Sequence, residues 1–265
     1  MGQCPSHLAR GTRALTRDWA KAVGGDRPRH GQEIARAGPR RTHGRPGGRA
    51  DRRGPEPDRT ISYGEAIDQV IEFYDGDGPL VTLIHGGYWR PSHNREHMRA
   101  LAAKLSENGF RVANIEYRRD PGNPEKLFQD VDAALSKLNE SVALIGFSVG
   151  GQLALIGKSN AHKLILLAPI TDLQRTKREQ LGEGAVESFF GDSELNQFDP
   201  MQKNYDQHLY IIHGDADNRV PLEHSRDFAR IKKASLMEIT GADHFAMIDP
   251  NGLAFSLILQ TLLSK

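Results

Sequence analysis

From residue 61 onward, short runs of Val, Ile and Leu alternate with amphipathic stretches of helical length. Near-continuous apolar runs are typical of strands that are covered on both faces. The expected strands span residues 69–74, 80–85, 111–117, 142–147, 163–167, 208–213 and 235–240. Apolar residues at helical spacing predict helices over residues 94–108, 124–138, 221–233 and 253–263. The alternation therefore predicts an α/β fold with a mostly parallel central sheet and helices on both faces.

One connection between expected strands is much longer than the others. It spans residues 169–207 and contains a short helical pattern over residues 185–190 together with Phe189, Phe190 and Phe198. A connection of this length is often a lid or cap over a site. Two ordinary surface helices are the alternative interpretation.

The first 60 residues have a different composition from the rest. They hold 13 Arg, one Lys and six acidic residues, so their charge is 14 − 6 = +8 and the remainder carries +1 − 8 = −7. They also contain 10 Gly and 6 Pro but few large apolar side chains. Such a segment cannot bury enough apolar surface to offset the entropy lost on ordering. We therefore expect residues 1–60 to be a disordered Arg/Gly/Pro-rich extension and residues 61–265 to form one domain.

The extension leaves several roles open. Its scarcity of Ser and abundance of Gly and Pro argue against a transit peptide. Its first residues, MGQCPS, fit the short pattern for N-terminal acylation, and its arginines could bind nucleic acid without sequence specificity. The simplest interpretation is a dispensable extension, which need not be translated.

The sequence also restricts the environment of the protein. The only cysteine, Cys4, lies in the extension, so disulfides and thiolate metal sites are not expected in the domain. No apolar run approaches the roughly 18 residues of a membrane span, and the N-terminus lacks a secretory apolar core. We expect a cytoplasmic protein with a small-molecule substrate, no metal or other cofactor and no specific nucleic-acid partner. The oligomeric state stays open, a homodimer included.

A nucleophile motif follows the strand expected at residues 142–147. Residues 146–150 read Gly-Phe-Ser-Val-Gly, and a small-residue helical stretch comes next. A serine on a sharp strand-to-helix turn needs small neighbours two positions away, because strand and helix approach closely there. The N-terminus of the following helix also favours developing negative charge. Ser148 is therefore the candidate nucleophile.

A serine hydroxyl needs a base to take its proton, and the base needs an orienting acid. His244 follows the strand expected at residues 235–240 and supplies the base. Asp215 and Asp217 follow the strand expected at residues 208–213, and Asp243 lies beside the histidine. The residues alone leave these three acids open, but the chain order Ser, Asp, His is that of α/β-hydrolases.

With these residues, the chain resembles an α/β-hydrolase from Tyr63 to Leu263. In that superfamily the acid commonly occurs in the pattern HGxxDxxVP. Residues 213–221, HGDADNRVP, match this pattern with Asp217 in the acid position. The resemblance therefore implies a triad of Ser148, Asp217 and His244.

The segment IHGGYWR, residues 84–90, leaves the strand expected at residues 80–85 through two glycines. A tetrahedral intermediate needs backbone N–H groups aimed at its oxyanion, one from the residue after the nucleophile and others from the loop after the third strand. Val149 would supply the first, and Gly86 and Gly87 the others, because glycine lets the main chain approach the reacting carbon. His85 is expected to be a structural hydrogen-bonding residue.

The HGGYW motif resembles that of the eukaryotic-type kynurenine formamidases (arylformamidases), as do residues 62–64, SYG, and 116–118, EYR. The resemblance implies a metal-free serine hydrolase that converts N-formyl-L-kynurenine to L-kynurenine and formate in tryptophan catabolism, through a formyl-serine intermediate. This chain departs from the longer members of that family by its brief region between Tyr63 and the HGG loop. A carboxylesterase acting on short-chain acyl esters is the alternative.

Four aromatic residues are the candidate substrate contacts: Tyr88, Trp89, Phe147 and Phe245. Their rings could stack on an anilide substrate. The competing interpretation is that Trp89 and Phe245 only pack the loops that carry them.

Two rival functions follow from the sequence. Residues 93–97, HNREH, read as the inverted zincin pattern, which would make the protein a zinc peptidase. However, Asn94 is expected to cap a helix there, so His93 and His97 would straddle the helix boundary. A hydrolase fold that binds without catalysis is the second rival, but such proteins usually lose a triad member.

Overall fold

The computed structural model describes residues 55–264, and the expectations for the N-terminal extension up to residue 54 lie outside this range. Eight strands form one sheet in the order β1-β2-β4-β3-β5-β6-β7-β8. Their bounds are β1 Arg59–Ser62, β2 Val70–Tyr74, β3 Leu80–Ile84, β4 Arg111–Ile115, β5 Ala143–Phe147, β6 Lys163–Leu167, β7 His208–Gly214 and β8 Ser235–Ile239. The pairs β1–β2 and β2–β4 are antiparallel, and all other pairs are parallel.

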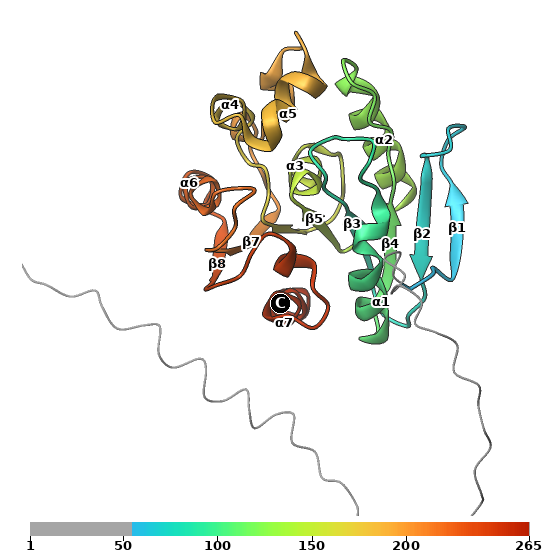
Figure 1. The fold of residues 1–265 in the computed structure, drawn as a ribbon. Coiled ribbons are helices and arrows are strands. Elements are labelled where there is room, and N and C mark those ends of the chain that lie inside the picture. Colours follow the sequence, from blue (N-terminus) through green and yellow to red (C-terminus); the bar gives the residue numbers. More distant parts are fainter. Residues whose placement is uncertain (1–54, 265) are drawn as a thin grey trace, which may run out of the picture. The chain divides into compact units, whose positions relative to one another are not determined.

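Helices lie on both faces of this sheet (Figure 1). They are α1 Arg99–Glu107, α2 Pro124–Lys137, α3 Val149–Ile156, α4 Leu173–Arg178, α5 Leu181–Phe190, α6 Leu222–Lys232 and α7 Leu253–Leu263. Short 3₁₀ turns are η2 Arg95–Met98, η3 Leu195–Phe198, η4 Pro200–Gln202 and η5 Phe245–Ile248. The expected mostly parallel α/β architecture is confirmed.

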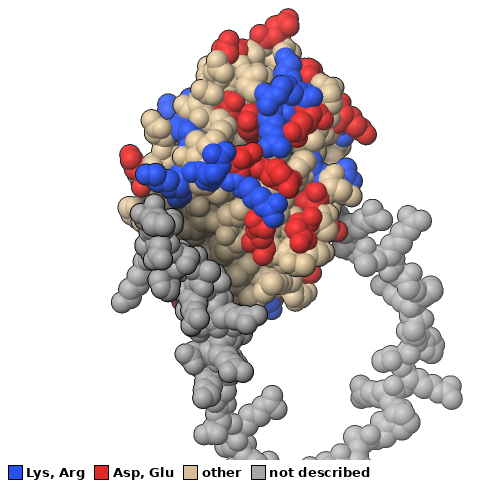
Figure 2. Space-filling view, turned by 90° about the vertical axis from the view of Figure 1, so that its left-hand side faces the viewer, with Lys and Arg blue, Asp and Glu red and all other residues tan. Residues whose placement is uncertain are grey.

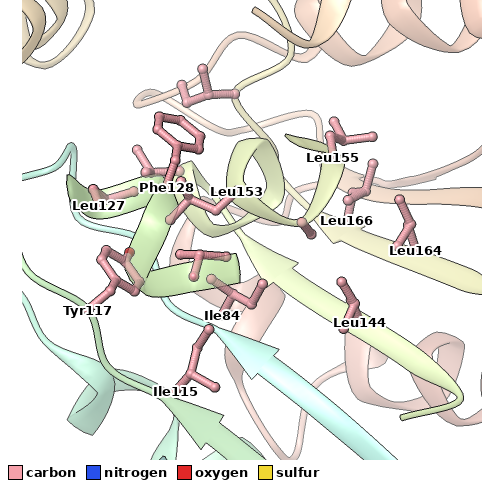
Figure 3. Close-up of a cluster of buried hydrophobic side chains, with 14 of the residues drawn as sticks. Ile84, Ile115, Tyr117, Leu127, Phe128, Leu144, Leu153, Leu155, Leu164 and Leu166 are labelled. Carbon is pink, nitrogen blue, oxygen red and sulfur yellow. The ribbon is translucent and has the colours of Figure 1, made fainter. Parts of the chain in front are cut away.

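Two apolar clusters form the core, one on each face of the sheet. One joins α2, α3 and α6 to the sheet, and Figure 3 shows part of it, including the helix residues Leu127 and Leu153 and strand residues such as Leu144. The other joins α1 and α7 to the opposite face and contains Ile145. Successive residues of a strand point to opposite faces, so the fully buried β5 supplies both clusters. This two-sided burial explains why the central strands are near-continuous Val, Ile and Leu.

The predicted beginning of the domain needs a correction. Strand β1 starts at Arg59, before the expected boundary at residue 61, and the sequence analysis did not identify it. Its residues are mostly exposed, and it pairs only with β2. Such an edge strand lacks the apolar run by which the buried strands were predicted. Residues before β1 also contact the domain, since Asp58 Oδ2 accepts a hydrogen bond from Asp75 N over 2.8 Å.

Charged side chains are interspersed on the side where α4, α6 and β8 lie. Figure 2 looks onto this side and shows Lys and Arg alternating with Asp and Glu. Arg226, for example, pairs with Glu238 over 2.7 Å. This face therefore presents mixed charge. None of the helices among residues 55–264 is long and apolar enough to cross a bilayer.

Candidate active site

Ser148 occupies a sharp turn between β5 and α3. Its dihedral angles are φ 55° and ψ −117°, a left-handed conformation that is strained for a residue with a Cβ. The flanking glycines are required by space: a Cβ on Gly146 would lie 2.7 Å from the Cα of Gly151, and one on Gly150 would collide with the carbonyl oxygen of Ile84. The close approach of strand and helix that the motif predicts is therefore present.

The loop after β3 passes directly beside this serine. A Cβ on Gly86 would lie 2.8 Å from the Cβ of Ser148, so no larger residue fits without displacing this serine. Gly87 has φ 118°, which side chains rarely allow. Within the described part of the chain, the N–H groups of Gly87 and Val149 have no backbone acceptor. For Val149 this follows from its place as the first residue of α3.

His244 and Asp217 lie side by side after β8 and β7. The Nδ1 of His244 donates to Oδ2 of Asp217 over 2.6 Å. Oδ1 of the same carboxylate accepts from the N–H groups of Arg219 at 2.8 Å and Val220 at 2.9 Å. Burial opposes ionisation of Asp217, but hydrogen bonds from His213 and His244 outweigh it and hold its pKa well below the usual range. The carboxylate is therefore charged and can orient the imidazole.

The other two candidate acids have different partners. Asp215 accepts from Gly241 N over 2.6 Å, and Asp243 accepts from Ala246 N over 2.9 Å. Of the three acids, Asp217 is the one whose side chain hydrogen-bonds to His244. The geometry thus agrees with the choice made from the HGxxDxxVP pattern.

Ser148 and His244 line one cavity of about 100 Å³. Its lining consists of Gly87, Tyr88, Arg90, His93, His97, Phe147, Ser148, Arg219, His244 and Phe245. The ring of His244 lies 4.8 Å from that of Phe147, the residue before the serine. No hydrogen bond joins the Ser148 hydroxyl to His244 in this structure. In unliganded enzymes such bonds are often long and tighten when substrate binds.

Three of the four expected aromatic contacts line this cavity: Tyr88, Phe147 and Phe245. Phe245 is 53% exposed, which leaves its ring face open. Tyr88 is fixed at both ends of its side chain, because its ring packs on Gly182 and its hydroxyl donates to Arg219 O over 2.6 Å. Burial, with the nearby Asp217 carboxylate, raises the pKa of Tyr88 to about 12, so the hydroxyl stays protonated.

The expectation that Trp89 contacts substrate needs correction. Trp89 is 1% exposed and does not line the cavity. Its ring stacks on Phe189 at 6.0 Å and meets Phe190 edge-on at 5.2 Å, and its Nε1 donates to Gln152 Oε1 over 3.0 Å. Trp89 therefore anchors the loop in the core, which is the packing role weighed as its alternative.

The long connection between β6 and β7 packs against this loop. It contains α4, α5, η3 and η4, and Phe189, Phe190 and Phe198 are all buried. The first part of α5 has left-handed residues, and there Arg90 Nη2 donates to the carbonyl oxygen of Gly182 over 2.5 Å. The segment is therefore attached to the loop beside the cavity, but none of its residues lines the cavity, so a role as a lid or cap stays a prediction.

A buried ionic network behind the loop was missed by the sequence analysis. The Nδ1 of His85 donates to the carbonyl oxygen of Gly86 over 2.8 Å, and its Nε2 lies 2.9 Å from Oε1 of Glu116. Arg119 also pairs with Glu116. Burial opposes the charge on Glu116, but His85 and Arg119 outweigh it and hold the pKa of Glu116 well below the usual range. The EYRR segment carried these residues, but only the fold brings them to His85.

This network also fixes the orientation of the peptide between Gly86 and Gly87. In a trans peptide the carbonyl and the following N–H point in opposite directions. Because His85 holds the Gly86 carbonyl on one side, the N–H of Gly87 is directed to the other. His85 thus has the structural hydrogen-bonding role expected for it.

A second missed residue supports Asp217. His213, the first residue of the HGxxDxxVP pattern, is fully buried, with Nδ1 2.7 Å from Ser225 Oγ. Its Nε2 lies 3.1 Å from Asp217 Oδ2 and 3.0 Å from Val220 O. The pattern itself was the available signal, because a histidine four residues before the acid can hold the acid loop.

The zincin-like segment forms the opposite rim of the cavity. Asn94 caps η2, since its Oδ1 accepts from Glu96 N over 3.0 Å, as expected. The rings of His93 and His97 lie 5.4 Å apart, and Glu96 points to Arg99 instead. Among residues 55–264 no group of three or more His, Cys, Asp or Glu is placed to hold a metal ion. The two histidines are therefore lining residues of the serine cavity.

The sheet order, the helices on both faces and the strained serine between β5 and α3 define the class of the α/β-hydrolases. The BD-FAE family profile matches residues 73–209, just over half of the chain. The chain therefore belongs to the BD-FAE family, an α/β-hydrolase-type esterase domain. The match covers the HGGYW loop and Ser148, whereas Asp217 and His244 lie beyond it.

Solved structures share the fold at low sequence identity. Esterase B from Lactobacillus rhamnosis is 18% identical, with a TM-score of 0.65 over 79% of this chain and 86% of its own. Thermogutta terrifontis esterase 2, solved in a form phosphonylated by sarin, is 19% identical, with a TM-score of 0.63 over 78% and 94%. A truncated carbohydrate esterase from gut microbiota is 17% identical, with a TM-score of 0.64 over 80% and 96%. No curated protein sequence matches the chain significantly.

Proposed function

We propose that the protein is a serine carboxylesterase that hydrolyses short-chain acyl esters. Ser148 is the nucleophile, His244 the general base and Asp217 the residue that orients it. The observation that carries this assignment is the 2.6 Å bond between His244 and the charged Asp217, at the same cavity as a strained serine. A serine in this setting is activated because the imidazole can take its proton.

The reaction follows from the placement of these groups. His244 removes the hydroxyl proton of Ser148 as the oxygen attacks the ester carbonyl carbon. The backbone N–H groups of Gly86, Gly87 and Val149 stabilise the resulting oxyanion. His244 then gives the proton to the departing alcohol, which leaves an acyl-serine. Water, deprotonated by the same histidine, releases the carboxylic acid and restores the serine.

The choice of an ester substrate draws on the family and on the fold neighbours. The BD-FAE family and the fold neighbours named above are esterases. A cavity of about 100 Å³ suits a small acyl group. The family and the fold neighbours favour an ester substrate over the formamide implied by the HGGYW resemblance, whereas the cavity has room for either acyl group.

Arylformamidase activity is the second candidate. It rests on the HGGYW motif and on the rings of Tyr88, Phe147 and Phe245 at the cavity, which could pack against an aryl leaving group. The reaction would convert N-formyl-L-kynurenine to L-kynurenine and formate through a formyl-serine. The burial of Trp89 removes one of the expected ring contacts and weakens this candidate.

A steady-state assay on matched substrates tests the proposal. We expect turnover of 4-nitrophenyl acetate and butyrate, with kcat/KM above that for N-formyl-L-kynurenine and for simple formanilides. Ser148→Ala should abolish this turnover while the protein stays folded, and chelators should leave the wild-type rate unchanged. Higher kcat/KM on the formamides would favour the second candidate. Full activity of folded Ser148→Ala would contradict both.

A further inference from the structure

The cavity beside Ser148 has a one-sided charge. Two arginines, Arg90 and Arg219, line it, and none of its lining residues is acidic. The residues beyond position 60 carry a net charge of −7, from +1 − 8, so a positively lined cavity is not a consequence of overall composition. The arginines belong to different loops, one after β3 and one after β7, which the fold brings to the same opening.

Arg219 is the better placed of the two. Its N–H donates to Asp217 Oδ1 over 2.8 Å, and its carbonyl oxygen accepts from the Tyr88 hydroxyl over 2.6 Å. The main chain at this position is therefore fixed from both sides. Its guanidinium forms no ion pair with any residue of the described range. An exposed guanidinium on a fixed backbone, at the rim of a reactive cavity, is available to a ligand.

The guanidinium of Arg90 is partly engaged by other groups of the protein. Its Nη2 donates to Gly182 O over 2.5 Å and lies 3.1 Å from Oε2 of Glu183. The side chain of Glu183 is 88% exposed, so this pair is a solvated one that contributes little. The bond to Gly182 holds the guanidinium against α5 and leaves its remaining N–H groups free to share an anion.

The two histidines of the rim, His93 and His97, both have lowered pKa values. Burial lowers the pKa of His93, and the charges of Arg90 and Arg219 are among the groups that lower it further. Burial likewise lowers the pKa of His97. Both imidazoles are therefore neutral near pH 7 and can donate or accept hydrogen bonds without competing for an anion as counter-charges.

We infer that the substrate is an ester that also carries a free carboxylate, bound at the cavity rim by Arg219 with Arg90 as the second cation. Guanidinium groups match carboxylates in geometry and charge, and two loops supply them beside the nucleophile. This inference rests on the proposed esterase function and narrows its substrate class. The carboxylate can belong to the acyl group or to the leaving alcohol, and matched substrates separate these two cases.

Two substrate pairs supply the test. On the acyl side, mono-4-nitrophenyl succinate is compared with 4-nitrophenyl 4-methylpentanoate, in which an uncharged isopropyl group of similar size replaces the carboxylate. On the leaving-group side, 4-acetoxybenzoate is compared with its methyl ester. The readout is the ratio of kcat/KM for the anionic member to that for the neutral one. A partly exposed charged hydrogen bond corresponds to a ratio of about 10 to 100.

Three variants locate the effect. Arg219→Gln should reduce the ratio toward one, and Arg219→Lys should restore part of it, with circular dichroism and thermal melting confirming the fold. Arg178→Gln is the matched control, because Arg178 is another exposed arginine without an ion pair among the described residues, and it lies on α4 away from this cavity. This control should keep the wild-type ratio. Raising the salt concentration should lower the wild-type ratio through screening.

The outcomes separate the two levels of the account. Hydrolysis of the neutral esters without preference for either anionic member overturns the carboxylate inference and leaves the esterase function standing. A preference that persists in Arg219→Gln overturns it as well. Failure to hydrolyse any of the four esters, with the wild-type protein folded, removes the esterase function and the inference together.

Discussion

The indole Nε1 of Trp89 donates to Oε1 of Gln152 over 3.0 Å, and Nε2 of the same amide donates to Phe198 O over 2.9 Å. One buried side chain on α3 thus joins the loop after β3 to the connection between β6 and β7. Both bonds are shielded from water. The loop that carries Gly86 and Gly87 is therefore held from the core, while the cavity side stays open for substrate.

Removing this amide should loosen the loop. We expect Gln152→Leu to lower the free energy of unfolding by about 1–3 kcal/mol, because it leaves the Trp89 N–H and the Phe198 carbonyl buried without partners. Urea denaturation measures this change. Gln197→Leu is a suitable control, since Gln197 is exposed on η3, and it should change stability by less than about 0.5 kcal/mol. Equal stability of both variants would show that the two bonds contribute nothing.

The second prediction concerns Asp217, the proposed acid of the triad. Asp217→Asn should lower kcat by about 10³- to 10⁴-fold, because the imidazole of His244 loses its charged partner and its preferred tautomer. Asp215→Asn alters the neighbouring acid, which bonds to Gly241 N and not to the histidine, and should stay within a few-fold of wild type. Steady-state kinetics on 4-nitrophenyl acetate distinguish the two. The reverse pattern would assign the acid to Asp215.

The third prediction concerns Glu116 and the pH dependence of the free energy of unfolding. Its pKa is held below the usual range in the folded protein by His85 and Arg119, against the opposing effect of burial. A carboxyl with a depressed folded pKa binds protons more readily when the chain is unfolded, so its contribution is full above the unfolded pKa, about 4.3, and is lost as pH falls below it. Wild type should therefore lose stability below about pH 4.3 more steeply than Glu116→Gln. Denaturation curves recorded between pH 3 and 7 give the free energy of unfolding at each pH. The prediction is wrong if this free energy falls equally steeply with pH in the two proteins.

The N-terminal boundary gives a fourth prediction. Deleting residues 1–54 should leave esterase turnover and melting temperature unchanged, in line with the proposal that the extension is dispensable. Deleting residues 1–62 also removes β1 and its ladder with β2, together with the bond from Tyr74 Oη to Pro55 O at 3.0 Å. We expect this longer deletion to lower the melting temperature measurably. Loss of activity in the shorter deletion would give the extension a role in the enzyme.

Much of the fold was accessible from local sequence patterns. The buried strands are recognisable as apolar runs. The nucleophile motif is recognisable by its glycines, because a Cβ on Gly146 or Gly150 would collide with the backbone at the strand-to-helix turn. Strand β1 was missed because an exposed edge strand has no apolar signature. The choice of Asp217 came from a pattern whose histidine, His213, proves to be a buried partner of that acid.

The features that the sequence did not predict depend on contacts between residues far apart in the chain. Whether Trp89 faces substrate or core depends on Phe189, Phe190 and Gln152, which lie far along the chain and close in the fold. The meeting of Arg90 and Arg219 at one cavity likewise needs the loops after β3 and β7 side by side. No residue spacing encodes either relationship, so the sequence left the first open and did not indicate the second.

The central claim is that Ser148 is activated by His244 and Asp217. Intact-protein and peptide mass spectrometry after incubation with a fluorophosphonate tests it most directly, because only an activated serine reacts readily. We predict one adduct per chain, on Ser148, formed at least about 10²-fold more slowly in folded His244→Ala. An unlabelled wild-type protein, an adduct on another serine, or equal labelling rates in the two proteins would contradict the account.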